Sequence, residues 1–141
     1  MRFTPDEWFE ALAFDAYDEP LRARIEALQW EVAARLLTLN IDVILDFGLW
    51  AREERDGYRA RGAALGAGTE IRFLDVSRAE LWARLSSRNA NLPPGTFHVD
   101  EASLDAWWSM FEPPMRDELE RQGSLPKPLP DGSGTSESER P

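Results

Sequence analysis

Hydrophobic residues recur at spacings of three and four in several stretches of the chain, and this period predicts amphipathic helices. The longest is expected over residues 21–39. Its apolar positions are Leu21, Ile25, Leu28, Val32, Leu36 and Leu39. Further helices are expected over 50–65, over 78–88 with Asp75 or Ser77 as its cap, and from Asp100 through Phe111. Asn40 and Gly66 suit the ends of the first two, because both residue types tolerate a left-handed backbone.

Two apolar runs between these helices predict strands. Residues 41–45 form a continuous, largely β-branched run typical of a buried strand, and residues 70–76 form the next one. Residues 2–4 suit the end of a third strand. Strands that alternate with helices predict an α/β fold with a parallel sheet flanked by helices. We expect one domain over residues 1–122 and a disordered tail over 123–141, which is rich in Gly, Ser, Pro and acid.

The start of the first helix has its own signature. Thr4 suits the N-cap, Pro5 suits the first helical position, and Glu7 completes a capping box. Asp6 then has two interpretations. It is a first-turn carboxylate that complements the helix dipole, or it is a general base that accepts a proton from a hydroxyl.

Composition excludes several kinds of chemistry. The chain has no cysteine and one histidine, His98, which excludes disulfides, thiolate metal sites and thiol catalysis, and makes a Ser-His-Asp triad improbable. The net charge of −10 argues against a general nucleic-acid-binding surface. No apolar run reaches the ~18 residues of a membrane span, and no signal peptide is recognisable, so we expect a soluble cytoplasmic protein.

The most informative stretch is 42–55, where an apolar run ends at Asp46 and an arginine-rich helix follows. Ligands of α/β proteins bind at the carboxyl ends of parallel strands. Asp46 there suits a metal or its bound water, and Arg52 and Arg55, three residues apart on one helix face, suit a phosphate. The alternative is an ordinary solvated helix, with Glu53 and Glu54 as the partners of the arginines.

A second arginine pair, Arg84 and Arg88, is four residues apart beside the loop that begins at Asn89. Such a pair suits a lid that closes over phosphates. The alternative is a helix end whose arginines complement the dipole.

Taken in order, several motifs carry a resemblance that covers roughly residues 2–114. They are TPDEW at 4–8, VILDFG at 43–48, RLSSRN at 84–89 and VDE at 99–101 before an aromatic helix. This order resembles the ATP-binding P-loop kinases of the AAA-like group, which are similar to polynucleotide kinase, zeta toxin and chloramphenicol phosphotransferase.

The resemblance implies a P-loop NTPase-like sheet and transfer of the γ-phosphate of ATP to a hydroxyl, with magnesium as cofactor. It implies Asp6 as the catalytic base and Asp46 beside the metal and the substrate. Arg52 and Arg55 become substrate or phosphate contacts, and Arg84 and Arg88 become lid arginines. The substrate is expected to be a small molecule or nucleotide, with long nucleic acid and membranes improbable as partners.

The chain departs from that family at its start. It contains no G-x-x-x-x-G-K-[ST] loop, and Lys127 is its only lysine. We therefore expect the fold to be N-terminally incomplete, and this chain to be inactive without that loop. One interpretation is a start codon assigned too late in the gene of a phosphotransferase. The other is a non-catalytic α/β binding module that associates with a partner subunit, with dimerisation through the incomplete sheet.

Overall fold

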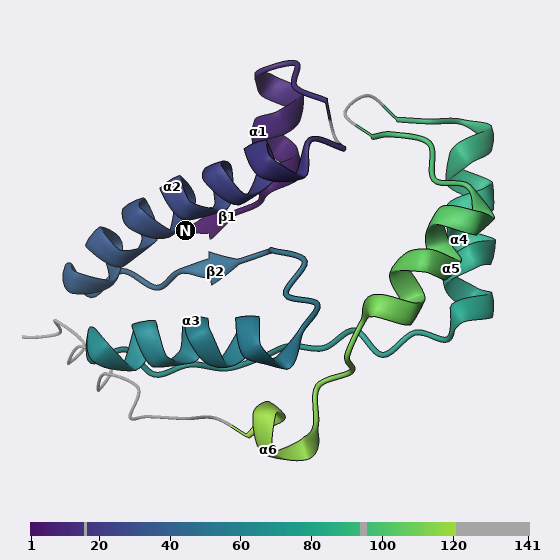
Figure 1. Cartoon of the computed structure of the whole chain (residues 1–141). Helices are drawn as coiled ribbons and strands as arrows, with labels where there is room; N and C mark the ends of the chain where they lie inside the picture. The colour runs from purple at the N-terminus through teal and green to yellow at the C-terminus, as the bar shows by residue number, and fades with distance from the viewer. Residues whose placement is uncertain (16, 94–95, 121–141) are drawn as a thin grey trace, which may run out of the picture.

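The computed structural model describes residues 1–15, 17–93 and 96–120, and Figure 1 shows their arrangement. These residues form a mixed α/β fold with a small parallel sheet, which confirms the predicted class. The elements are β1 (Arg2–Phe3), α1 (Pro5–Ala11), α2 (Glu19–Thr38), β2 (Ile44–Leu45), α3 (Arg52–Ala64), α4 (Arg78–Ala90), α5 (Glu101–Met110) and α6 (Arg116–Leu119).

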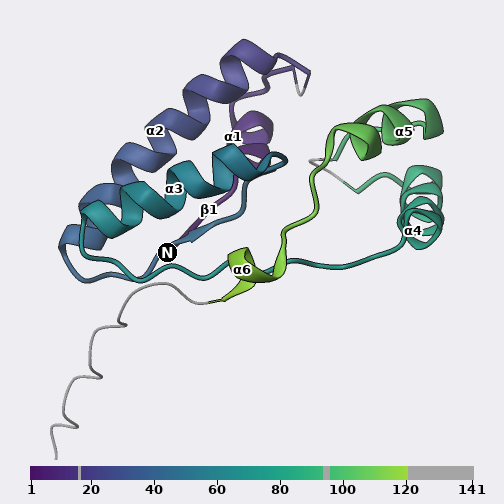
Figure 2. The same ribbon diagram turned by 60° about the horizontal axis from the view of Figure 1, so that its bottom comes forward.

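The sheet consists of β1 and β2, paired in parallel with Phe3 opposite Leu45. α1 packs on α2, and α2 lies beside α3 (Figure 2). The contact between α2 and α3 is aromatic, because the ring of Trp30 meets that of Tyr58 edge to face at 5.4 Å. The guanidinium of Arg61 lies over both rings. The two long helices therefore form one layer beside the short sheet.

The helix α2 buries one line of residues, of which only Ile25 belongs to the predicted apolar face. Ile25, Gln29 and Ala33, four residues apart, face the interior. Leu28 and Val32 of the predicted apolar face are 51% and 42% exposed, so this part of the prediction is wrong. The helix ends as predicted, with Asn40 at a left-handed φ of 58°.

The strand predictions need the largest correction. The run 41–45 contributes only Ile44–Leu45 to the sheet, and Ile44 is 62% exposed rather than buried. Residues 70–76 form no strand at all, and Leu74 is 84% exposed. The physical reason is that a strand is stable only when its backbone is hydrogen-bonded to a neighbouring strand. No strand of the described chain pairs with residues 70–76. Instead they run back beside α3 (Figure 1).

The predicted helix caps are correct at two helices and wrong at a third. Ser77 caps α4 and Asp100 caps α5, each through its side chain. Pro5 begins α1, but Thr4 makes no side-chain cap bond and Glu7 pairs with Arg2, so the capping box is wrong. The helix α6 was not predicted, and the predicted tail from Gly123 lies outside the described residues.

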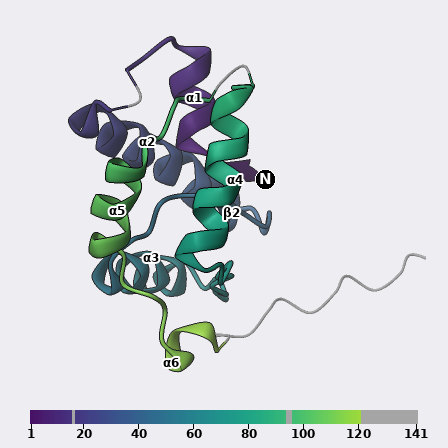
Figure 3. The ribbon, with the colours of Figure 1, turned by 90° about the vertical axis from the view of Figure 1, so that its right-hand side faces the viewer.

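The helices α4 and α5 form a pair that stands apart from α1, α2 and α3 in Figure 1, and Figure 3 views the molecule from the side of this pair. Arg78 at the start of α4 holds α5 through Glu101 at 2.9 Å and Asp105 at 2.5 Å. Tyr17 joins this pair to the N-terminal half, because its hydroxyl donates to the His98 carbonyl and its ring contacts Phe97. In the described part of the chain, no helix is both long and apolar enough to cross a membrane.

Candidate functional site

The parallel register brings the carboxyl ends of β1 and β2 to one edge of the sheet. Thr4 follows β1 and Asp46 follows β2, and the Thr4 hydroxyl donates to Asp46 Oδ2 at 3.5 Å. Asp46 NH donates to the Phe3 carbonyl at 2.8 Å, which fixes its backbone. Arg2 Nη1 lies 3.8 Å from the same carboxylate, whose side chain is 57% exposed. Asp46 is thus held at its backbone and accessible at its side chain.

Asp6 lies in the first turn of α1, two residues beyond Thr4 at the same edge. Its Oδ1 accepts a hydrogen bond from Arg22 Nη1 of α2 at 2.9 Å, and its side chain is 59% exposed. The carboxylate is therefore reachable from solvent while paired. Its role as general base stays a prediction.

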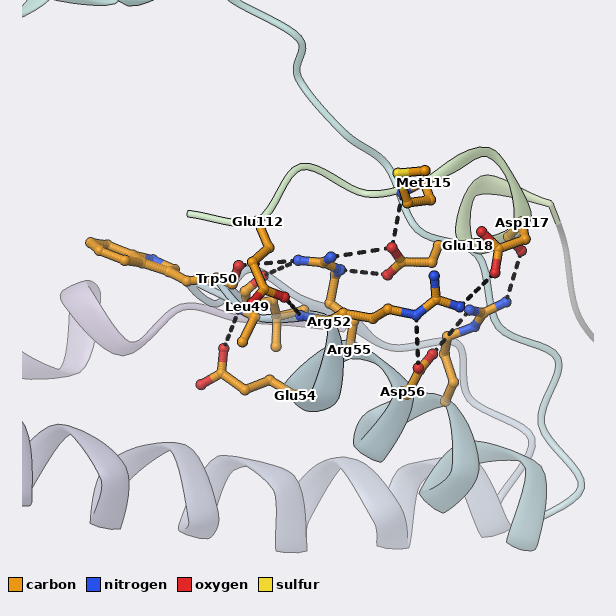
Figure 4. A network of polar contacts seen from close by, with 12 residues as sticks. Leu49, Trp50, Arg52, Glu54, Arg55, Asp56, Glu112, Met115, Asp117 and Glu118 are labelled. Atoms are coloured by element: carbon orange, nitrogen blue, oxygen red, sulfur yellow. Dashed lines mark hydrogen bonds and ion pairs between the residues drawn. The ribbon is translucent and has the colours of Figure 1, made fainter. Parts of the chain in front are cut away.

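The predicted anion contacts of α3 lie in two different environments. Arg55 is 3% exposed, and Figure 4 shows its guanidinium enclosed by partners. Nε lies 2.7 Å and Nη2 3.2 Å from the Glu118 carboxylate, and Nη1 donates to the carbonyls of Leu49 and Trp50. Every nitrogen of the Arg55 guanidinium thus has a partner, and none is available to a ligand in this arrangement.

Arg52, one turn earlier, is 45% exposed at its side chain. Its Nη2 pairs with Asp117 at 2.6 Å and its Nε lies 3.4 Å from Asp56. Hydrogen bonding to Asp117 raises the pKa of Arg52 above its ordinary value. Arg52 is therefore charged, accessible and held by carboxylates at the surface.

Glu118 is the residue that sequence reasoning missed. It lies 63 positions from Arg55 in the chain and is 1% exposed. Hydrogen bonds from Arg55 lower the pKa of Glu118 to about 2, against its desolvation by burial. A buried carboxylate needs a buried partner, but nothing local to the acidic stretch around Glu118 identifies which arginine it meets.

The predicted lid arginines, Arg84 and Arg88 of α4, do not converge on one point. Arg84 pairs with Glu80 at 2.5 Å on the exposed face of α4. Arg88 Nη2 donates to the Phe97 carbonyl at 3.2 Å, and its Nε is buried without a hydrogen-bond partner in the described chain. Asn89 beside it clamps the backbone of Val99 through both ends of its amide. Arg88 therefore lines the base of the loop, whereas Arg84 faces outward.

The predicted residues thus fall into three groups. Asp6 and Asp46 lie at the sheet edge, Arg52 and Arg55 lie in the first turn of α3, and the predicted lid arginines lie on α4. Figure 1 shows the elements that carry them. The aromatic contact between Trp50 and Trp107, with ring centroids 6.1 Å apart, joins the second group to α5.

The residues present do not by themselves fit ATP with magnesium. The sequence has no glycine-rich loop with lysine to cradle phosphates. In residues 1–15, 17–93 and 96–120, no three carboxylates or imidazoles gather into a metal-holding group. Asp6 and Asp46 each offer an accessible carboxylate, but by themselves they form neither a nucleotide site nor a metal site, so no chemical step is assigned through either group.

A family model described as an AAA domain matches residues 2–114 of the chain. This family implies P-loop, kinase-like ATP binding, and its members typically bind ATP and magnesium. The mixed α/β fold with its small parallel sheet agrees with such a domain. No curated protein and no solved structure matches the chain.

Proposed function

The chain belongs to the AAA domain family of P-loop, kinase-like NTPases, and we propose that it carries the acceptor side of a kinase-like phosphotransfer site. The acceptor is a hydroxyl of a small molecule or nucleotide. The single observation that carries this proposal is the parallel pairing of β1 with β2. That pairing supports a site with Asp6 and Asp46 at one edge of the sheet.

Each carboxylate has a separate task in this proposal. Asp6 accepts a hydrogen bond from the acceptor hydroxyl and is placed to take its proton, since it is exposed and lies within the first turn of α1. Asp46 would supply one carboxylate ligand to a metal ion or its bound water, which would offset the charge of a phosphate group. Its backbone bond to Phe3 and its hydrogen bond from Thr4 limit its movement, which favours such positioning.

The arginines have different parts. Arg52, Arg84 and Arg88 are the proposed contacts to phosphate or to a substrate anion, because guanidinium groups bind phosphate oxygens well. The occupied nitrogens of Arg55 support a positioning role instead. It holds the carbonyls of Leu49 and Trp50, and so the turn that follows Asp46.

The test measures binding of hydroxyl acceptors to the whole chain. Nucleosides and an aminoglycoside are titrated in turn, and binding is monitored by the changes in amide chemical shift in NMR spectra. Binding is assigned to the sheet edge when an acceptor changes the amide chemical shifts of residues there. Asp6→Asn and Asp46→Asn should each weaken binding of that acceptor. Glu10→Gln, an exposed carboxylate elsewhere on α1, is the matched control and should leave binding unchanged. Acceptor binding that neither aspartate variant weakens would refute the proposal.

Nucleotide binding is tested separately. Because the chain lacks the phosphate-cradling loop, ATP with magnesium should bind weakly or not at all in isothermal titration. Micromolar affinity would contradict this expectation.

A second candidate is a non-catalytic module that pairs with a partner subunit through its sheet. The observation in its favour is that Ile44, on a sheet of only two short strands in the described chain, is 62% exposed. So small a parallel sheet is marginal alone, and an added strand would cover it. Sedimentation velocity should then show a dimer that Ile44→Lys dissociates. A monomer at all concentrations would contradict self-pairing.

A further inference from the structure

The segment from residue 112 to residue 118 lies across the start of α3 and directs three carboxylates at it (Figure 4). Glu112 accepts the backbone NH of Arg52 at 2.8 Å, Asp117 pairs with the Arg52 guanidinium, and Glu118 pairs with Arg55. A helix start that carries two arginines attracts anions through its free NH groups and its charge. In this protein one short segment of the same chain supplies the anions.

The two guanidinium pairs differ in how easily they separate. The side chains of Arg55 and Glu118 are 2% and 0% exposed and share two hydrogen bonds. Opening that pair would leave a buried, unpaired charge, so it is a permanent anchor. The side chains of Arg52 and Asp117 are 45% and 61% exposed, and water can replace each partner. This outer pair can open while the inner one stays closed.

We propose that Asp117 is a built-in competitor for Arg52. A phosphate group must displace the Asp117 carboxylate before it can bind the Arg52 guanidinium. The Glu118–Arg55 anchor keeps Asp117 beside Arg52, so the carboxylate acts at the millimolar effective concentration of a short tether. Asp117 occupies Nη2 of Arg52 and Asp56 lies 3.4 Å from Nε, and these two nitrogens form one edge at which a guanidinium binds a phosphate in bidentate fashion. One guanidinium cannot serve the carboxylate and a phosphate fully at the same time. The segment is therefore autoinhibitory toward weakly binding anions. This inference rests on the proposed phosphate-binding role of Arg52.

The experiment measures binding of inorganic pyrophosphate to the whole chain through the arginine Nε–Hε signals in NMR. Asp117→Asn removes the competitor's charge and should tighten binding at Arg52 by about two- to fivefold, the range for an exposed ion pair. Arg52→Ala combined with Asp117→Asn should abolish this gain.

The matched control is Asp105→Asn. Asp105 pairs with Arg78 at 2.5 Å, is 60% exposed like Asp117, and its loss changes the net charge by the same amount. It should leave pyrophosphate affinity unchanged. An equal gain in this control would mean that overall charge, not the contact with Arg52, controls binding, and would overturn the proposal.

The proposal is also overturned if Asp117→Asn leaves pyrophosphate affinity unchanged or weaker, or if pyrophosphate does not reach Arg52 in that variant. Because Glu118 still anchors the segment, near-ultraviolet circular dichroism should be the same in Asp117→Asn and the parent chain. The proposed acceptor site fails on a different measurement, the acceptor titrations of Asp6→Asn and Asp46→Asn. The two failures are therefore distinguishable.

Discussion

Replacing Arg55 with methionine should destabilise the protein far more than removing any exposed ion pair. The change leaves the Glu118 carboxylate buried without its partner, and removing one member of a buried pair costs about 3–5 kcal/mol. The carbonyls of Leu49 and Trp50 also lose a donor. Domains of this size have a free energy of unfolding of only about 5–15 kcal/mol, so the variant should be close to unfolding at 25 °C.

The assay is urea unfolding followed by far-ultraviolet circular dichroism. Glu118→Met should cost a similar amount, but the double variant Arg55→Met with Glu118→Met should cost much less than the two single changes together, because no charge is then left unpaired. Arg84→Ala is the matched control. Its pair with Glu80 is exposed on both sides, so the loss should stay below about 1 kcal/mol. A loss of that size or smaller for Arg55→Met would refute the reasoning.

Four further outcomes are expected. The pKa of Glu118 falls from 4.5 in the unfolded chain to about 2 in the folded protein. The ionised Glu118 therefore stabilises the fold fully above pH 4.5, and this contribution is lost as the pH falls toward 2. Glu118→Gln should reduce the loss of stability in acid, measured by thermal melts. Asn89→Ala should lower the free energy of unfolding by about 1–3 kcal/mol, because buried Val99 loses both backbone partners. Gln29→Met should raise the urea midpoint, because the buried amide of Gln29 has no partner in the described chain. Ser77→Ala should cost about 1 kcal/mol of helix stability in the same assay, since it removes the α4 cap.

Each outcome has a control or a contradicting result. An acid transition unchanged by Glu118→Gln would assign the acid loss to other carboxylates. Asn91→Ala, an exposed asparagine at the end of α4, should have little effect compared with Asn89→Ala. Destabilisation by Gln29→Met would mean that its amide has a partner after all. Ser77→Thr should retain most of the cap that Ser77→Ala removes.

The placement of Asp6 and Asp46 at one edge of the sheet could be predicted from the sequence, whereas the surroundings of the arginines could not. Asp46 follows a recognisable apolar run and Asp6 follows a recognisable helix start, so their shared edge needed only the rule that crossovers make parallel strands. The different fates of Arg52 and Arg55 depend on residues 112–118, which are distant in sequence. Charge and spacing alone could not distinguish the two arginines.

The sequence by itself determined the helices other than α6, because their signals are local. Each signal acts within a few residues of the helix that it predicts. These signals are the three- and four-residue period, the left-handed Asn40, and the caps at Ser77 and Asp100. Tertiary structure alone decided the strands, since a strand is stable only against a neighbour. β2 keeps two residues of its predicted run, and residues 70–76 form no strand of the sheet. It also decided that Glu118 is buried against Arg55. The desolvation of a charge becomes tolerable only when folding delivers its opposite partner.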